Sequence, residues 1–387
     1  SFASAVPARS AGTRDPRVGM ARAAGSPAMS TRRPLLLGLL GAVSTGCSTP
    51  PPPNGPASAP QWPAPPEQPR FVFEATLRNG SSVRDDSSAA QMRRLMTGED
   101  ESRASFGKPL AVAAGKGRVY VTDTGGRRIF VFDFVRRRTF SFGLRFEGEL
   151  KQPGRIALDG EGRVYVVDTT ARRVVVFDAL GLYLGQIDGA ADWVRPTAVA
   201  VDPAGERVYV VDTGGVENDS HRVWRYGDRG RGLGALGRRG SQAGEFNLPT
   251  DAVVARDGTL WVLDAGNFRV QAFDPAGRFL RAFGTVGNGI GQFARPRGLA
   301  VDVDGLVYVS DAAFCNVQVF QPDGELLLAL GSRAERDAPG RYLLPAKLAT
   351  DETGRLYVVD QFLHKVEVLR RLSDDEGRQR QRQATAG

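Results

Sequence analysis

The chain has 387 residues, 41% hydrophobic and 24% charged, which is ordinary for a folded globular protein and unlike a disordered one. Much of its formal net charge of +8 comes from six arginines in residues 1–46, where there is only one acid; the remainder has 45 basic and 42 acidic residues. So balanced a remainder argues against a nucleic-acid-binding protein, and we expect no nucleic-acid partner.

The N-terminal region has the pattern of an export signal. From Met29, two arginines precede an apolar run over residues 35–43, and small residues then lead to Gly46 and Cys47. A basic start, a short apolar run and small residues are typical of a signal peptide, and this run is too short to span a bilayer. We therefore expect residues 29–46 to be the signal and residues 1–28 to be an upstream extension absent from the mature protein.

Gly46-Cys47 after small residues resembles the lipobox of bacterial lipoproteins, with Ser44 where an aliphatic residue is usual. The resemblance implies that acyl chains on Cys47 anchor the protein in a membrane. The alternative is an internal apolar stretch with a chance cysteine. The segment TRRPLLL also resembles a twin-arginine export motif, so export by that route or by the general secretory route is expected. Ser48, where an inner-membrane retention signal would place aspartate, favours the outer membrane.

Residues 47–69 are predicted to form a tether. Half of residues 50–69 are prolines. A segment of this composition behaves as a semi-rigid, extended spacer, so it would hold a folded domain away from the membrane.

One phrase recurs six times between residues 106 and 372. It is a short run such as VYVVD, and its final aspartates are Asp123, Asp168, Asp212, Asp264, Asp311 and Asp360. A proline stands 14 to 16 residues before each aspartate, at Pro109, Pro153, Pro196, Pro249, Pro296 and Pro345. Each proline opens an apolar run, and each aspartate precedes a turn and further alternating runs. Four short strands per unit, repeated six times, predict an all-β, six-bladed β-propeller over residues 70–372.

The ends of the repeat region indicate how the ring closes. The sixth unit has no fourth strand, because residues 373–387 are almost wholly polar, and we expect them to be a disordered tail. The isolated run RFVFEATLRN, residues 70–79, is predicted to supply the missing outer strand of the last blade. Pairing the two ends in one sheet would lock the ring and limit its exposed edges.

Residues 260–311 resemble the NHL repeat, with its D-x-x-N-x-R-[IV] turn and P-x-G-[LIV]-A strand, and the resemblance covers residues 106–372. The layout of signal, proline-rich tether and propeller is similar to that of bacterial six-bladed NHL lipoproteins. The resemblance implies the fold but leaves the function open, since NHL propellers include binders, sensors, scaffolds and a few lyases.

A possible metal site lies in the turns after the aspartates. Aligned on the following basic residue, His221, Cys315 and His364 occupy equivalent positions, and cysteine and histidine are the usual zinc ligands. The turn around His364 resembles a zinc-ligand turn of NHL-type amidating lyases. Those enzymes also need a histidine beside a strand proline, where this chain has Leu110, Gly154, Thr197, Thr250, Arg297 and Ala346. We expect no metal and no cofactor, and a rim position for His364.

Two departures from the repeat are candidate binding sites. The turn of the third unit is five residues longer and contains Glu217, Asn218 and Asp219, which could bind calcium or form a polar insertion. The second group stands just after the strand prolines, at the predicted channel mouth: Arg155, Asp251, Arg297 and Lys347. These charges could hold an anionic or zwitterionic ligand, or neutralise one another.

Three functions remain compatible with the sequence. The leading hypothesis is a lipid-anchored, non-enzymatic propeller of the cell envelope that binds an envelope protein or a small ligand. The second is a metal-dependent lyase or lactonase-like enzyme that uses the central channel. The third, disfavoured by export and by the balanced charge, is a nucleic-acid binder.

Overall fold

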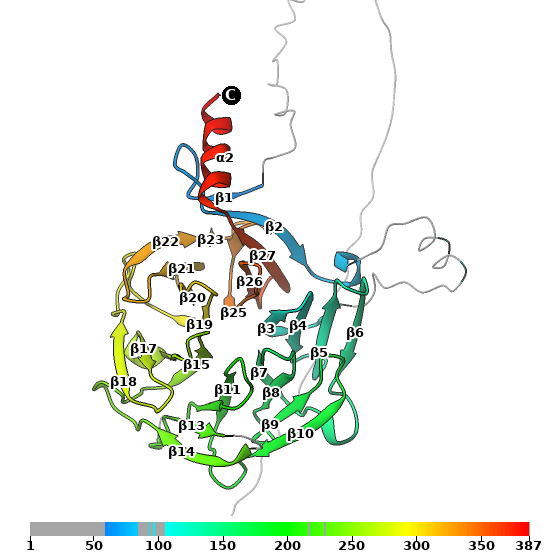
Figure 1. Ribbon diagram of the computed structural model, residues 1–387, viewed down its shortest axis with the longest axis vertical. Coiled ribbons are helices and arrows are strands. Elements are labelled where there is room, and N and C mark those ends of the chain that lie inside the picture. The colour runs from blue at the N-terminus through cyan, green and yellow to red at the C-terminus, as the bar shows by residue number, and fades with distance from the viewer. Residues whose placement is uncertain are drawn as a thin grey trace, which may run out of the picture. The chain divides into compact units, whose positions relative to one another are not determined.

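The six repeats form six antiparallel sheets arranged in a ring, in a computed structural model of the chain (Figure 1). The structure describes residues 59–83, 92, 96, 105–215, 217–227 and 230–386. The expected extension, signal and Cys47, and residues 47–58 of the tether, lie outside these residues. The prediction of a six-bladed β-propeller is confirmed.

Blades one to five each contain four consecutive strands, with the first strand innermost. Blade one has β3 (Pro109–Gly115), β4 (Arg118–Asp123), β5 (Arg128–Asp133) and β6 (Arg138–Phe142). Blade two has β7 (Pro153–Leu158), β8 (Val164–Asp168), β9 (Arg173–Phe177) and β10 (Tyr183–Asp188). Blade three has β11 (Pro196–Val201), β12 (Val208–Asp212), β13 (Arg222–Tyr226) and β14 (Gly232–Leu236). Blade four has β15 (Pro249–Val254), β16 (Leu260–Asp264), β17 (Arg269–Phe273) and β18 (Phe279–Phe283). Blade five has β19 (Pro296–Val301), β20 (Val307–Asp311), β21 (Asn316–Phe320) and β22 (Leu326–Leu330).

Blade six is built from both ends of the repeat region. Its inner strands are β25 (Pro345–Thr350), β26 (Arg355–Asp360) and β27 (Lys365–Arg371), and its outer strands are β2 (Phe71–Leu77) and the short β1 (Gln61–Trp62). β2 pairs antiparallel with β27, so that Phe71 faces Arg371 and Leu77 faces Val366. The predicted closure by the N-terminal strand is therefore confirmed.

Hydrophobic residues on the second strands fill the spaces between blades. The residues of β8, β12, β16 and β20 are all buried, because each strand has a neighbouring blade over both faces. The outer strand β10 instead alternates between more and less exposed residues. Six hydrophobic clusters, one at each contact between adjacent blades, make up the described core. The blades thus depend on one another for burial, as the repeat pattern predicts.

The aspartates define one face of the ring. In every blade the aspartate that ends the second strand pairs with the proline that begins the first. Its carboxylate also accepts hydrogen bonds from the backbone segment that enters the blade; Asp123, for example, accepts from the N–H groups of Gly107 and Lys108. We call the face that carries the six prolines and these aspartates the proline face.

Shorter elements complete the described chain. They are the 3₁₀ turns η1 (Gly80–Val83), η3 (Phe146–Gly148) and η5 (Ala265–Asn267), and the two-residue parallel strands β23 (Ser332–Arg333) and β24 (Arg341–Tyr342).

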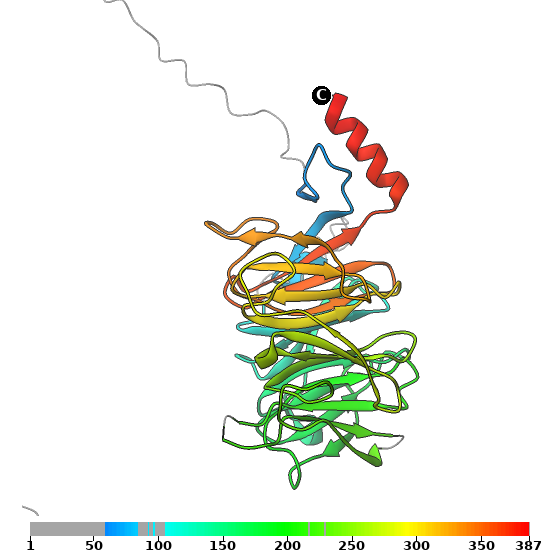
Figure 2. The ribbon, with the colours of Figure 1, turned by 90° about the vertical axis from the view of Figure 1, so that its left-hand side faces the viewer.

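The predicted disordered tail is wrong for most of its length, because helix α2 spans Asp374–Ala386 and projects from the edge of the ring (Figures 1 and 2). Ser373 caps it: its hydroxyl accepts from the N–H of Glu376, whose carboxylate accepts from the N–H of Ser373. This reciprocal pair satisfies two N-terminal donors of the helix. Within the described chain, no helix has the length and apolar character needed to cross a membrane.

The end of the expected tether is also part of the folded domain. Pro60 and Trp62 accept backbone hydrogen bonds from Phe73 and Arg70, and Trp62 packs against the hydrophobic cluster between blades five and six. Gln381 of α2 donates to the carbonyl oxygen of Pro66. The domain therefore begins about ten residues earlier than composition suggested, because proline does not prevent a segment from packing at a sheet edge.

Candidate functional site: the mouth of the central channel

A β-bulge follows the proline of every innermost strand. The strand register shifts just after Pro109, Pro153, Pro196, Pro249, Pro296 and Pro345. A bulge bends the strand and re-aims its side chains. The structure brings the four channel-mouth residues predicted from sequence into one cluster at these bulges, although they come from four blades.

Lys347 and Asp251 form a buried ion pair at the centre of this cluster. The ammonium of Lys347 on β25 lies 2.9 Å from both carboxylate oxygens of Asp251 on β15, and donates a third hydrogen bond to the carbonyl of Leu299. The exposed fractions of the two side chains are 7% and 0%. Asp251 also accepts from the N–H groups of Leu299 and Ala252. Burial lowers the pKa of Lys347, Asp251 opposes this shift, and Arg155 adds to it.

Arg155 extends across the channel from blade two. Its Nε donates to the carbonyl oxygen of Thr250 in blade four at 2.9 Å, and its Nη2 donates to that of Arg297 in blade five at 2.6 Å. Nε also lies 3.6 Å from Asp251, and only 11% of the Arg155 side chain is exposed. Within the described residues the guanidinium of Arg297 has one hydrogen bond, from Nη2 to Gln361.

Charge and hydrogen bonding at the mouth are not balanced. Among the described residues, Asp251 is the one carboxylate that pairs with Lys347 and Arg155, and Arg297 has no ion pair, so two positive charges of the cluster remain uncompensated. Burial, together with repulsion from Arg155 and Arg295, lowers the pKa of Arg297 to about 10. Nη1 of Arg155 and the hydroxyl of Thr250 are buried without a hydrogen-bond partner among the described residues. Unpartnered buried donors are rare in folded proteins and need an explanation.

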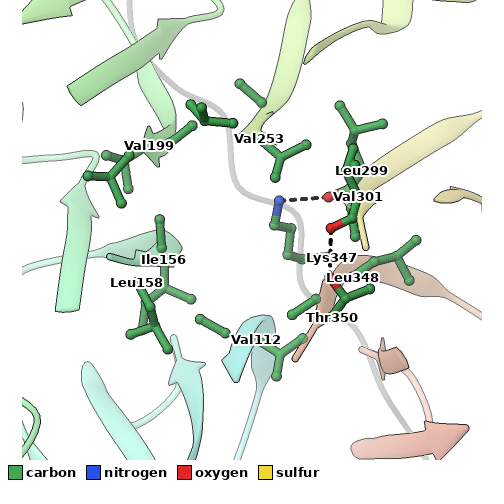
Figure 3. Close-up of a pocket in the computed structure, with 18 of the residues that line it drawn as sticks. Val112, Ile156, Leu158, Val199, Val253, Leu299, Val301, Lys347, Leu348 and Thr350 are labelled. Carbon is green, nitrogen blue, oxygen red and sulfur yellow. Dashed lines mark hydrogen bonds between the residues drawn. The ribbon is translucent and has the colours of Figure 1, made fainter. Parts of the chain in front are cut away.

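Beyond Lys347 the side chains that line the channel are mostly aliphatic. A cavity of about 190 Å³ is lined by residues three to five positions after the strand prolines: Val112–Ala114, Ile156–Leu158, Val199–Val201, Ala252–Val254, Leu299–Val301 and Leu348–Thr350. Figure 3 shows the ammonium of Lys347 within this ring of aliphatic side chains, bonded to Leu299. The cavity is smaller than the roughly 300 Å³ of typical ligand pockets. The polar cluster is therefore the better candidate for recognition.

The turns that carry the proposed metal ligands share one geometry in five blades. The aligned residues Arg127, Arg172, Phe268, Cys315 and His364 all have a φ near +50°, the left-handed conformation that closes a short hairpin turn. His364 is exposed, whereas Cys315 is buried, with its Sγ near the carbonyl oxygens of Ala312 and Leu343. Burial raises the pKa of the Cys315 thiol, which disfavours the thiolate that binds metals.

His221 differs from His364. The longer turn of blade three folds it into the core, where it is fully buried. Its Nε2 lies 3.0 Å from the carbonyl oxygen of Gly215, and its Nδ1 accepts from the N–H of Leu248. With Nε2 as donor both ring nitrogens are engaged, so His221 braces the turn.

The inserted turn does not gather its oxygen donors. The side-chain oxygen of Asn218 accepts from the N–H groups of Gly215 and Ser220, while Glu217 and Asp219 are exposed. In the part of the chain that the structure describes, no group of three or more His, Cys, Asp or Glu side chains is placed to hold a metal ion.

Thr250 is the residue that sequence reasoning missed. It appeared only as a position without histidine, although it directly precedes Asp251 at a strand start. Its buried, unpartnered hydroxyl lies on the residue whose carbonyl binds Arg155. Its position beside a charged residue at the mouth could have singled it out, but its missing partner depends on the packing of another blade.

Comparison with known proteins supports the same architecture. The NHL repeat family model matches residues 246–273 and 293–321, within blades four and five. No curated protein sequence gives a significant match.

Similar solved structures include a Bacteroides thetaiotaomicron protein of unknown function, with 17% identity over 77% of each chain and a TM-score of 0.54. A Xanthomonas campestris gluconolactonase has 18% identity over 69% of this chain and 87% of its own, with a TM-score of 0.51. An auxiliary nutrient binding protein from Bacteroides thetaiotaomicron has 11% identity over 68% and 69%, with a TM-score of 0.52. At these identities the likeness concerns the fold alone. The six-bladed ring and the family match together show that the chain folds as a six-bladed β-propeller and contains NHL repeats in blades four and five.

Proposed function

We propose that this propeller is anchored in the cell envelope by lipid on Cys47 and binds an envelope protein or a small ligand at its proline face, without transforming it. The signal-like segment before Cys47 and the proline-rich residues after it support the anchor. The outer membrane is the favoured location, given Ser48.

The pattern of hydrogen bonds at the channel mouth is the observation that supports a binding role. All three N–H groups of Lys347 and both oxygens of Asp251 are engaged within the protein. Neither group is set up to exchange a proton with a reacting molecule, which general acid–base catalysis requires. Arg155 instead retains a buried donor, Nη1, for which the described part of the chain offers no acceptor. Fixed donors of this kind are suited to holding a ligand.

Membrane fractionation of cells that express the full chain tests the anchor. Cys47→Ser should move the protein from the membrane fraction to the soluble fraction, because one residue carries the acyl chains. Cys315→Ala is the matched control: it removes the other cysteine, which is buried in the core, and should leave the protein with the membranes. Equal membrane association of Cys47→Ser and the parent would refute the lipoprotein assignment.

A further inference from the structure

Among the residues that the structure describes, the arginine pair Arg155 and Arg297 lacks the full set of carboxylate partners that such groups usually have. Arg155 and Arg297 come from facing blades, and Arg155 lies close enough to help lower the pKa of Arg297. Asp251, the carboxylate in contact with Arg155, already binds Lys347 at 2.9 Å through both oxygens, and lies 3.6 Å from Arg155. Like charges held together and shielded from water are unfavourable without a counter-charge. The fold nevertheless keeps them in place: the backbone carbonyl oxygens of Thr250 and Arg297 accept from Arg155, and the side chain of Gln361 accepts from Arg297.

The unpartnered groups are all donors suited to an oxyanion. Nη1 of Arg155 is buried and has no hydrogen-bond acceptor among the described residues. The hydroxyl of Thr250, the residue whose carbonyl accepts from Arg155, is likewise buried without a partner there. The Arg297 guanidinium has a single hydrogen bond among the described residues. Guanidinium groups bind carboxylate and phosphate oxygens through paired N–H donors.

We propose that Arg155, Arg297 and Thr250 form a binding site for a small solute that carries two negative charges on carboxylate or phosphate groups. This inference rests on the proposed binding function and names the ligand class for it. The two uncompensated positive charges match a dianion. Arg155, which reaches blades four and five from blade two, forms the floor of the site, and the Lys347–Asp251 pair holds that floor in position.

Calorimetric titration of the full chain carrying Cys47→Ser tests the site without any lipid. The probes are succinate and inorganic phosphate, with chloride at equal ionic strength as the reference. One or both dianions should bind saturably, at about one per chain, and the preferred probe tells a dicarboxylate site from a phosphate site. Binding of neither dianion above the chloride reference would overturn the proposal.

Variants separate a binding role from a structural one. Arg297→Gln and Thr250→Val should each weaken binding about tenfold, the value of a hydrogen bond to a charged group. Both should leave the melting temperature of the free protein unchanged or higher, because they remove a like charge or an unsatisfied hydroxyl. Arg256→Gln, which removes an exposed arginine from the opposite face, is the control and should bind as the parent does. Unchanged affinity in both site variants would refute the assignment.

The two proposals can fail separately. Loss of membrane association in Cys47→Ser together with no dianion binding would leave the anchor standing and remove this site. Dianion binding in a protein that never associates with membranes would retain the site and remove the lipid anchor.

Discussion

Replacing Lys347 by methionine would remove half of the ion pair that closes the channel. The Asp251 carboxylate would remain fully buried, with two backbone N–H groups and the more distant Arg155 as partners. Breaking a buried pair from one side typically costs 3–5 kcal/mol, and these remaining partners place Lys347→Met near the lower end, about 3 kcal/mol. Asp251→Asn leaves Lys347 beside Arg155 without a counter-charge, so we expect about 5 kcal/mol.

The double variant distinguishes this mechanism from general damage to the channel. With Lys347→Met and Asp251→Asn combined, no uncompensated charge of the pair remains, and the free energy of unfolding should return to within about 1 kcal/mol of the parent. Urea denaturation of the four proteins measures the coupling. Additive losses in the double variant would refute the reasoning. So would single losses below about 1 kcal/mol, which are typical of a solvated surface pair.

Three further predictions concern the ring and its turns. Deleting residues 59–79 removes β1 and β2 and should cause aggregation or a large fall in melting temperature, whereas deleting α2 should have little effect; equal effects would contradict closure by β2. His364→Ala should change the free energy of unfolding by less than about 0.5 kcal/mol. His221→Ala should lower it by about 2 kcal/mol or more, because the loss of the imidazole leaves buried backbone groups unpaired. If an untagged chain carried one zinc that is lost in His364→Ala, His364 would be a metal ligand and not a rim residue. Burial alone would raise the pKa of Asp123, but the hydrogen bonds to its carboxylate outweigh burial and lower that pKa. The stability that Asp123 contributes is therefore present above about pH 4 and is lost as the pH falls. Asp123→Asn should flatten the acid limb of a curve of stability against pH.

The ring was predictable because its signals are local and repeated. A proline and an aspartate at a nearly constant spacing mark the two ends of a strand pair in each blade, and the structure pairs them in all six. The closing strand was predictable for a related reason: the sixth unit lacked a fourth strand, and the run at residues 70–79 was a strand that belonged to no unit. Both features are visible in the residue pattern without any distance between side chains.

The tail was mispredicted because composition outweighed a short motif. Residues 373–387 are polar enough to suggest disorder, but Ser373 followed three residues later by Glu376 is a capping box that begins a helix. The histidines illustrate a different limit. His221 and His364 are equivalent in alignment, and only the path of the inserted turn decides that His221 is buried and His364 exposed.

The channel mouth shows how ring geometry brings charged residues of different repeats into one cluster. At the second residue after the proline, blades one, three and five have Ala111, Ala198 and Gly298, while blades two, four and six have Arg155, Asp251 and Lys347. A Cβ on Gly298 would lie 2.1 Å from the carbonyl oxygen of Ala346, so blade five has no room there for a side chain.

Small and large residues therefore alternate around the axis, a common way to fill a narrow barrel or ring. Three charged positions cannot pair completely among themselves. Lys347 and Asp251 neutralise each other, which leaves the positive charge of Arg155 without a full counter-charge. Arg297 beside it adds to this positive charge. A ring that alternates in this way has a positive mouth for geometric reasons, and this excess of positive charge is the basis of the proposed anion site.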